Sequence, residues 1–177
     1  KDTATVSEGV AYGMLIALFA GDWETFNGLW VYNSIMRQEG AHKLMPWLLV
    51  GFYNPDKATS ATDADLDIAT ALILAYQKTG FKPYLDSALV IGNLIWTHEI
   101  DPTTLLVWPA NDRIFWDPSK SAWNPSYFSP VAFRLLAQYD PYHPWLDALD
   151  ANYNWLQAVQ NDNTGLFCDW AYPNGTC

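Results

Sequence analysis

The stretch Ala61-Thr62-Asp63-Ala64-Asp65-Leu66-Asp67-Ile68-Ala69 begins a segment that runs to Lys78 and is apolar on most sides after its acidic start. Its apolar members occur on most faces of a helix and not along one stripe: Leu66, Ile68, Ala69, Leu72, Ile73 and Ala75. A helix that is apolar nearly all round lies in a protein interior. Gly80 follows as a helix stop signal. The segment therefore predicts a buried helix that begins with carboxylates.

The same kind of pattern extends in both directions along the chain. Residues 7–20 predict a second buried helix, whereas residues 23–38 and 83–98 are more mixed and predict outer helices. Residues 126–139 and 144–160 predict a third pair of helices. No alternating apolar and polar run of useful length predicts a strand. Buried and amphipathic helices that alternate in this way predict an all-α toroid of helical hairpins.

Aromatic residues are unusually frequent in the 177-residue chain, with 10 Trp, 10 Tyr and 8 Phe. They indicate either a large aromatic core or a groove whose exposed rings stack on the C–H faces of sugars. Two long loops, residues 42–60 and 101–125, are rich in Trp, Pro and Asn. Because loops of this length in a compact domain are usually functional, we expect part of a binding site there.

The charge balance excludes two classes of partner. The net charge is −10, with only nine Lys plus Arg, so we expect neither nucleic acid nor an anionic membrane surface as a partner. No stretch approaches the length of a membrane-spanning helix. The acidity suits a soluble protein that acts on a neutral substrate, or on a cationic one such as chitosan.

The two ends of the sequence bear on whether the chain has been cut and on whether it contains a disulfide. The start Lys1-Asp2-Thr3 has no hydrophobic region behind it and is typical of a processed or truncated end. Cys168 and Cys177 either close a small disulfide loop or remain two free thiols.

Three carboxylates open or follow the predicted buried elements: Glu8, Asp63 and Asp169. Singly, an acid in the first turn of a helix is explained by the helix dipole and by capping. If the inner helices run parallel round a ring, however, Glu8 and Asp63 meet at one rim, with Asp169 brought in on its loop. Two carboxyls that flank a sugar linkage supply the proton donor and the base of glycoside hydrolysis, and a third can raise the pKa of the donor.

Metal chemistry is not expected from the sequence. The run of Asp63, Asp65 and Asp67 lacks the pattern of a calcium loop, because Ile68 stands where Gly is needed and Leu74 where Glu is needed. The three histidines are scattered, so we expect no cofactor and no metal.

Four motifs resemble glycoside hydrolase family 8. Residues 7–14, Ser-Glu-Gly-Val-Ala-Tyr-Gly-Met, resemble the S-E-G-x-x-Y-G-M segment of that family. Residues 61–69 resemble its signature segment, and Asn124-Pro125-Ser126-Tyr127 resembles its N-P-S-Y stretch. Gly165-Leu166 with Asp169-Trp170 resembles its G-L-x-x-D-W segment. All four occur in the order found in the family.

The resemblance implies an (α/α)6 barrel and hydrolysis with inversion. It implies Glu8 as general acid, Asp169 as general base and Asp63 as the central subsite carboxylate. The carboxyl groups of Glu8 and Asp169 are then expected roughly 6.5–9.5 Å apart. It also makes five residues candidates for substrate binding, namely Trp47, Tyr127, Trp108, Trp170 and Asp65. For the tryptophans Trp47 and Trp108, packing in the core is the alternative.

The chain departs from the family in length. Members of the family are considerably longer, and three helical pairs make half of a six-pair ring. We therefore expect residues 1–177 to be a partial catalytic domain with an open apolar face, and the missing half of the barrel as a partner.

The expected activity is that of an inverting endo-β-1,4-glucanase acting on β-glucan polysaccharide or oligosaccharide, either secreted or periplasmic. A chitosanase or xylanase of the same family remains open, as does a catalytically silent glycan-binding fragment.

Overall fold

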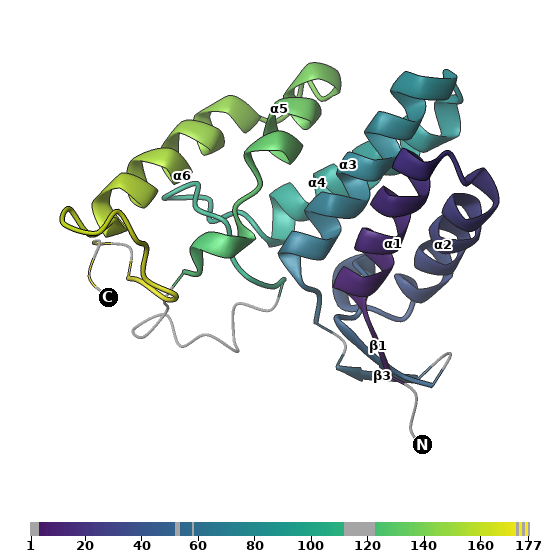
Figure 1. Ribbon diagram of the computed structural model, residues 1–177, viewed down its shortest axis with the longest axis horizontal. Coiled ribbons are helices and arrows are strands. Elements are labelled where there is room, and N and C mark those ends of the chain that lie inside the picture. Colours follow the sequence, from purple (N-terminus) through teal and green to yellow (C-terminus); the bar gives the residue numbers. More distant parts are fainter. Residues whose placement is uncertain are drawn as a thin grey trace.

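The computed structural model describes residues 4–51, 54–57, 59–111, 123–172, 174 and 176. Figure 1 shows three helical hairpins arranged side by side, with a small sheet at the end of the first hairpin. The helices are α1 (Ser7–Ala20), α2 (Trp23–Met36), α3 (Thr62–Thr79), α4 (Lys82–His98), α5 (Pro130–Tyr139) and α6 (Trp145–Val159). Two short 3-10 turns, η1 (Ala41–Lys43) and η2 (Pro125–Tyr127), lie in the connecting loops. The predicted alternation of buried and outer helices is therefore confirmed.

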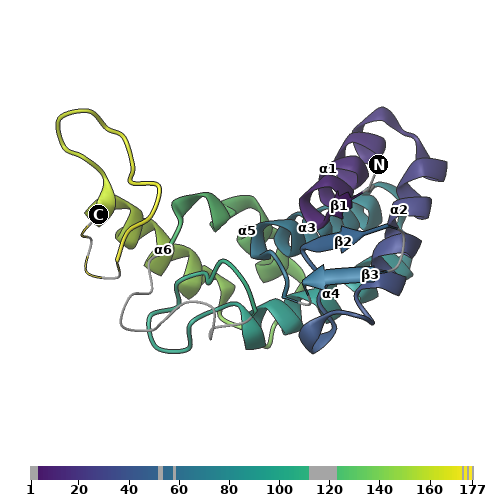
Figure 2. The same cartoon turned by 90° about the horizontal axis from the view of Figure 1, so that it is seen from below.

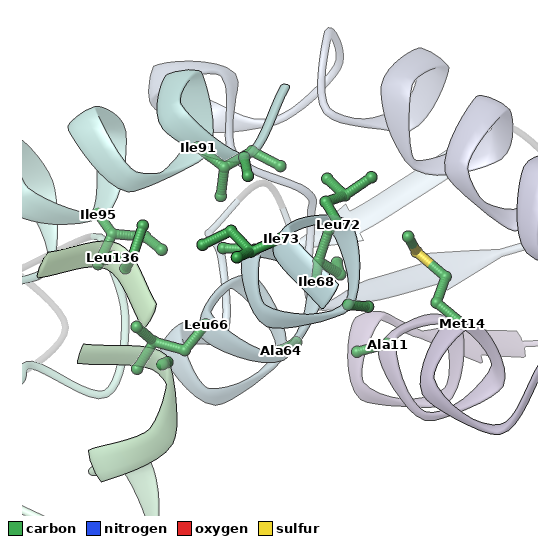
Figure 3. Close-up of a cluster of buried hydrophobic side chains, with 14 of the residues drawn as sticks. Ala11, Met14, Ala64, Leu66, Ile68, Leu72, Ile73, Ile91, Ile95 and Leu136 are labelled. Carbon is green, nitrogen blue, oxygen red and sulfur yellow. The ribbon is translucent and has the colours of Figure 1, made fainter. Parts of the chain in front are cut away.

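Helix α3 forms the centre of the main core. It contacts α1 on one side and α4 and α5 on the other. Figure 3 shows its apolar side chains between Ala11 and Met14 of α1 and the branched side chains of α4 and α5, including Ile95 and Leu136. Each fully buried Leu or Ile contributes about 1.5–3 kcal/mol. The helix ends at Gly80, whose φ of 70° is the left-handed conformation that glycine adopts without strain.

The region 126–139 differs from the single helix that its pattern predicts. The structure has η2, then an extended link, and then α5 beginning at Pro130. Proline disfavours helical backbone in the residue before it, and Ser129 is extended with φ −112° and ψ 94°. The Ser129 hydroxyl accepts from the backbone N–H of Ala132 and caps α5 instead of continuing the earlier turn. The other helix boundaries differ from prediction by at most two residues.

A three-stranded antiparallel sheet is a second departure from the predicted all-helical pattern. The strands are β1 (Ala4–Val6), β2 (Leu48–Val50) and β3 (Asn54–Lys57), in the order β1-β2-β3. Strands of three or four residues are too short to produce a readable alternation of apolar and polar residues. Figure 2 shows the strands side by side. Because β1 leads directly into α1, the sheet fixes the place at which α1 begins.

A second, smaller hydrophobic cluster lies beyond α5, and its six members are Leu106, Trp108, Trp123, Trp155, Val159 and Ala171. It joins α6 to the loops before η2 and after α6. An isolated antiparallel bridge between Trp123 and Ala171 connects those two loops. Part of the second long loop, residues 112–122, lies outside the described residues.

The expected open apolar face is confirmed on α1. Tyr12, Ile16 and Phe19 are 54%, 69% and 70% exposed, and their spacing places them along one side of the helix. In the described part of the chain, no helix is long and apolar enough to cross a membrane.

Candidate active site

Glu8 and Asp63 are brought together, as the sequence predicts, because α1 and α3 run side by side and begin at the same end of the molecule (Figure 1). Burial, together with the nearby charges of Glu8 and Asp67, raises the pKa of Asp63 to about 6. The backbone N–H of Ala64 donates to Asp63 at 2.9 Å and opposes part of this shift. Asp63 therefore titrates much closer to neutrality than an exposed aspartate.

Two tyrosines face this pair of carboxylates. Burial, together with the charges of Asp63 and Glu8, raises the pKa of Tyr127 to about 12. The pKa of Tyr12 is raised by burial and by the charges of Asp63, Asp67 and Glu8. Both phenols are therefore protonated at neutral pH, and each has an O–H to donate. We call Glu8, Tyr12, Asp63, Asp67 and Tyr127 the rim group.

Two members of the rim group, Tyr12 and Asp67, were not predicted from the sequence as site residues. Tyr12 lies four residues after Glu8 on α1, and Asp67 lies four residues after Asp63 on α3. Residues four apart share one face of a helix. The signal that finds them is thus helical spacing from each predicted carboxylate.

Local hydrogen bonds orient Glu8 and place Trp47 beside it. The hydroxyl of Ser7 donates to Oε2 of Glu8 at 3.2 Å. The backbone N–H of Ser7 donates to the carbonyl of Trp47 at 3.1 Å, and the N–H of Trp47 donates to the carbonyl of Thr59 at 2.8 Å. Trp47 is half-buried and packs against the main core. The structure thus places the backbone of this tryptophan at the start of α1, next to Glu8.

Asp169 lies on the exposed loop after α6, attached to the segment that carries Tyr127. The side-chain amide of Asn124 donates to Oδ1 of Asp169 at 3.2 Å. The Trp123–Ala171 bridge, with N–H to O distances of 2.7 and 2.9 Å, holds the two segments together. The charges that raise the pKa of Asp63 come from Glu8 and Asp67, and Asp169 is not among them. Asp169 is thus connected to the rim group through residues 124–127.

The prediction that Asp65 binds substrate is wrong for this structure. Its side chain is 2% exposed and faces the carboxyl of Glu99 in the interior. The physical reason is helical geometry: Asp65 is two residues from Asp63, so it points to a different side of α3. Glu99 itself, fully buried at the end of α4, was not singled out from the sequence.

The candidate tryptophans fall into different environments. Trp108 is 7% exposed and stacks on Trp123 with ring centroids 4.5 Å apart, so the core-packing alternative holds for it. Trp170 is partly exposed beside Asp169 on the loop after α6. Cys168, in the same loop, is disulfide-bonded. Cys177, the other half of the predicted loop, lies outside the described residues.

The described residues contain no group of three or more His, Cys, Asp or Glu side chains placed to hold a metal ion. The rim group consists of three carboxylates, one of which is an aspartate with a pKa of about 6, and two phenolic O–H donors. Such an arrangement suits proton transfer to and from an uncharged polar substrate.

Comparison with known proteins gives one consistent family. The sequence model of the glycosyl hydrolases of family 8 matches residues 1–177. Endoglucanase 2 of Ruminiclostridium josui is 33% identical over 178 residues, which are 97% of this chain and 37% of that enzyme. Endoglucanase A of Acetivibrio thermocellus is 33% identical over 181 residues, with the same coverage. The reducing-end xylose-releasing exo-oligoxylanase Rex8A of Paenibacillus barcinonensis is 29% identical over 192 residues, 96% of this chain and 48% of that enzyme.

Solved structures agree on the fold. Endoglucanase Cel10 of Klebsiella pneumoniae superposes with a TM-score of 0.83 at 20% identity, over 95% of this chain and 55% of that one. A family 8 endo-β-1,4-glucanase from an Achatina fulica gut metagenomic library gives 0.86 at 23% identity, over 97% and 56%. The chain spans about half or less of the length of these proteins. The predicted (α/α)6 barrel, with about half of it present, is thereby confirmed.

Proposed function

The chain belongs to glycoside hydrolase family 8, and we propose that it carries the acid and base groups of an inverting endo-β-1,4-glucanase. The observation that carries the proposal is the meeting of Glu8 and Asp63 at one rim, with Asp169 tethered to the same segment as Tyr127. Relatives named endoglucanase, at 33% identity over nearly the whole chain, support the same reaction.

In the proposed reaction Glu8 gives its proton to the glycosidic oxygen as the C–O bond breaks. A water molecule attacks the anomeric carbon from the opposite face and loses its proton to Asp169. Asn124 occupies Oδ1 of Asp169, which leaves Oδ2 for the water. The proposed part of Tyr127, which lies within reach of the charges of Asp63 and Glu8, is to donate its O–H to the substrate.

Asp63 has a different part in this proposal. Its position beside Glu8 puts a negative charge where positive charge develops on the sugar ring. Because burial and two neighbouring carboxylates raise its pKa to about 6, Asp63 is ionised at neutral pH and neutral in mild acid. The proposal therefore requires a pH above about 6 for full stabilisation of the oxocarbenium-like transition state.

The proposed substrate is an uncharged β-1,4-glucan, either cellulose or mixed-linkage glucan. A net charge of −10 suits a neutral chain better than an acidic one. Trp47, whose carbonyl accepts from the N–H of Ser7 next to Glu8, is the proposed aromatic residue for stacking on a sugar ring. Xylan is the second candidate, favoured by the similarity to the exo-oligoxylanase Rex8A at 29% identity.

We place the reaction outside the cytoplasm and within a completed barrel. The disulfide at Cys168 is typical of oxidising compartments. Ile16 and Phe19 on α1 are apolar and exposed, and exposed apolar faces on soluble proteins are usually covered by a partner. In the active protein we propose that further helices of the same barrel cover them.

The test is reducing-sugar release by the protein that carries this chain. Carboxymethylcellulose, barley β-glucan, xylan and chitosan are compared with parent protein, with Glu8→Gln, and with Glu39→Gln as a matched change at an exposed glutamate. We expect cleavage of the two glucans, lost in Glu8→Gln and kept in Glu39→Gln, and an inverted anomer as the first product seen by NMR. Cleavage of xylan or chitosan alone would identify that polysaccharide as the substrate in place of glucan, and cleavage of none of the four would refute the proposal.

A further inference from the structure

A second carboxyl pair lies beneath the rim group and has no part in the reaction above. Asp65 in the first turns of α3 is 2% exposed, and Glu99 at the end of α4 is 0% exposed. Their carboxyl groups face each other, since each acts on the pKa of the other through hydrogen bonding, and the charge of Glu99 also raises the pKa of Asp65. Two buried carboxyls in contact repel strongly when both are ionised.

Hydrogen bonds connect this pair to the residues that start α3. The hydroxyl of Ser60 donates to Oε1 of Glu99 and accepts from the backbone N–H of Asn111, the latter at 3.1 Å. The backbone N–H of Ser60 donates to Oδ1 of Asn111 at 3.2 Å. The N–H of Thr62 donates to the carbonyl of Pro109 at 3.2 Å. The residues immediately before Asp63 are thus held on both sides, by Glu99 and by the loop at residues 109–111.

One oxygen of each carboxyl lacks a donor. Among the described residues, Oδ2 of Asp65 and Oε2 of Glu99 are buried atoms without a hydrogen-bond donor. A single proton held between the two groups gives each oxygen a partner and removes the repulsion. Nearly all buried polar atoms in folded proteins are satisfied, so the shared proton is the simplest account of these two oxygens.

The electrostatics of the pair agree with a held proton. Burial raises the pKa of Glu99 to about 8, and the nearby hydroxyls of Ser60 and Thr62 limit the rise. Burial and the charge of Glu99 raise the pKa of Asp65 well above its usual range, while Arg37 and the backbone N–H of Met45 act in the opposite direction. The arginine therefore offsets part of the cost of burying charge and does not neutralise the pair.

We propose that Asp65 and Glu99 share one proton and act as a positioning unit that fixes the first turn of α3, and with it Asp63, at the rim of the site. The effect on hydrolysis rests on the proposed function, whereas the shared proton does not. Asp63 lies between Thr62 and Asp65, so its direction follows from the turn that the pair holds. Neither member of the pair touches the substrate.

The proton of the pair has a direct spectroscopic signature. At pH 7 the infrared spectrum of this chain should contain a carbonyl band of a neutral, buried carboxyl group, because exposed carboxyls are ionised there. The band should disappear in the double variant Asp65→Asn/Glu99→Gln and persist in Asp86→Asn, a change at an exposed aspartate. Absence of the band from the parent, or its persistence in the double variant, would overturn the shared proton.

The pH dependence of stability gives an independent test. Both pKa values are raised on folding, so the pair stabilises the fold fully below about pH 3.8 and loses this contribution as the pH rises towards 8. Arg37 and Asp63 also act on the pair, and His42 stacks on His98 next to Glu99 with centroids 3.9 Å apart. All four remain in the double variant, so their own contributions largely cancel in the difference. The decline between about pH 3.8 and 8 should be flatter in the double variant, and an unchanged decline would contradict the proposal.

Positioning is tested by the backbone itself and by the rate. Amide resonances of residues 62–64 should shift with a midpoint near pH 8 in the parent and stay constant in the double variant. If the double variant does not fold, the single variant Glu99→Gln is measured in its place. The amide of the new glutamine can donate to Asp65 without an extra proton, so the infrared band should weaken. In the hydrolysis assay, kcat should fall above pH 8 in the parent alone, with KM unchanged. An identical pH profile in the two proteins would show that the pair has a structural role only. A parent protein that cleaves nothing would refute the proposed function, and the infrared spectrum would then decide whether the pair shares a proton.

Discussion

The main core and the second cluster hold the proposed catalytic groups in different ways. Glu8 and Asp63 lie in the first turns of α1 and α3, and the buried side chains of both helices pack in the main core. Asp169 lies on an exposed loop, and its described contacts are one backbone bridge nearby and one hydrogen bond from Asn124. The acid is therefore placed by helix packing, and the base is placed by a few polar contacts. The difference predicts that changes near the base affect rate and leave stability intact, whereas changes in the main core affect stability first.

The largest effect is expected from Asp169→Asn. An amide in place of the carboxylate does not accept a proton from the attacking water, so the hydrolysis rate should fall by about 10²- to 10⁴-fold. The thermal midpoint of unfolding should stay unchanged because the side chain is exposed. Initial rates on β-glucan and a melting curve on the same sample measure both quantities.

The matched control is Asp162→Asn, an exposed aspartate in the same loop that has no place in the proposed reaction. It should leave both rate and melting temperature at parent values. Equal losses of rate in the two variants would show that the loop responds to charge in general, and the assignment of Asp169 as base would then be given up.

The next effect compares one substitution in the two clusters. Leu72→Ala in the main core removes a fully buried side chain and should lower the free energy of unfolding by about 2–5 kcal/mol. Leu156→Ala removes a half-buried side chain beside the second cluster and should cost about half as much or less. Urea unfolding followed by tryptophan fluorescence measures the two values, and a larger cost for Leu156→Ala would reverse the proposed contrast.

The same contrast explains which features were readable from the sequence. The buried helix α3 and the meeting of Glu8 with Asp63 follow from local periodicity and from the parallel course of α1 and α3. Tyr12 and Asp67 were equally accessible, because each lies four residues from a predicted carboxylate.

Features that depend on long-range contacts or on very short elements were not readable. The hydrogen bond from Asn124 to Asp169 joins residues that are 45 positions apart in the sequence, and no local pattern predicts it. The facing of Asp65 and Glu99 is likewise set by how α3 packs on α4, so Asp65 looked like one more acid of the helix start. The three-residue strands β1 and β2 lack the length for a periodic signal.

A smaller effect is expected at Asn124, the side chain that links the two regions. Asn124→Ala removes the N–H that orients Asp169 and the acceptor for the N–H of Ser126 at 2.9 Å, so the rate should fall by about tenfold with little change in KM. Asn124→Asp keeps the acceptor for Ser126 and places a second carboxylate beside Asp169. Its rate should be below that of the alanine variant at neutral pH.

The control for this position is Asn154→Ala, at an exposed asparagine on α6. Parent-like kinetics are expected there. If Asn124→Ala also behaves like the parent, the orientation of Asp169 must come from the backbone bridge alone, and the contribution of Asn124 to the site would be refuted.

The smallest effect concerns Asp63 and the acid side of the pH profile. Its pKa is raised to about 6, first by burial, so lowering the pH from 7 to 5.5 protonates it and should reduce kcat roughly fourfold. Asp67 contributes to that rise through its charge, so Asp67→Asn should move the acid limb to lower pH and restore rate at pH 5.5. The sign for stability is opposite: a raised pKa stabilises the fold below the ordinary value of 3.8 and loses that contribution as the pH rises through about 6. An acid limb that stays in place in Asp67→Asn would show that the limb does not report on Asp63, and the part given to Asp63 in the reaction would then be refuted.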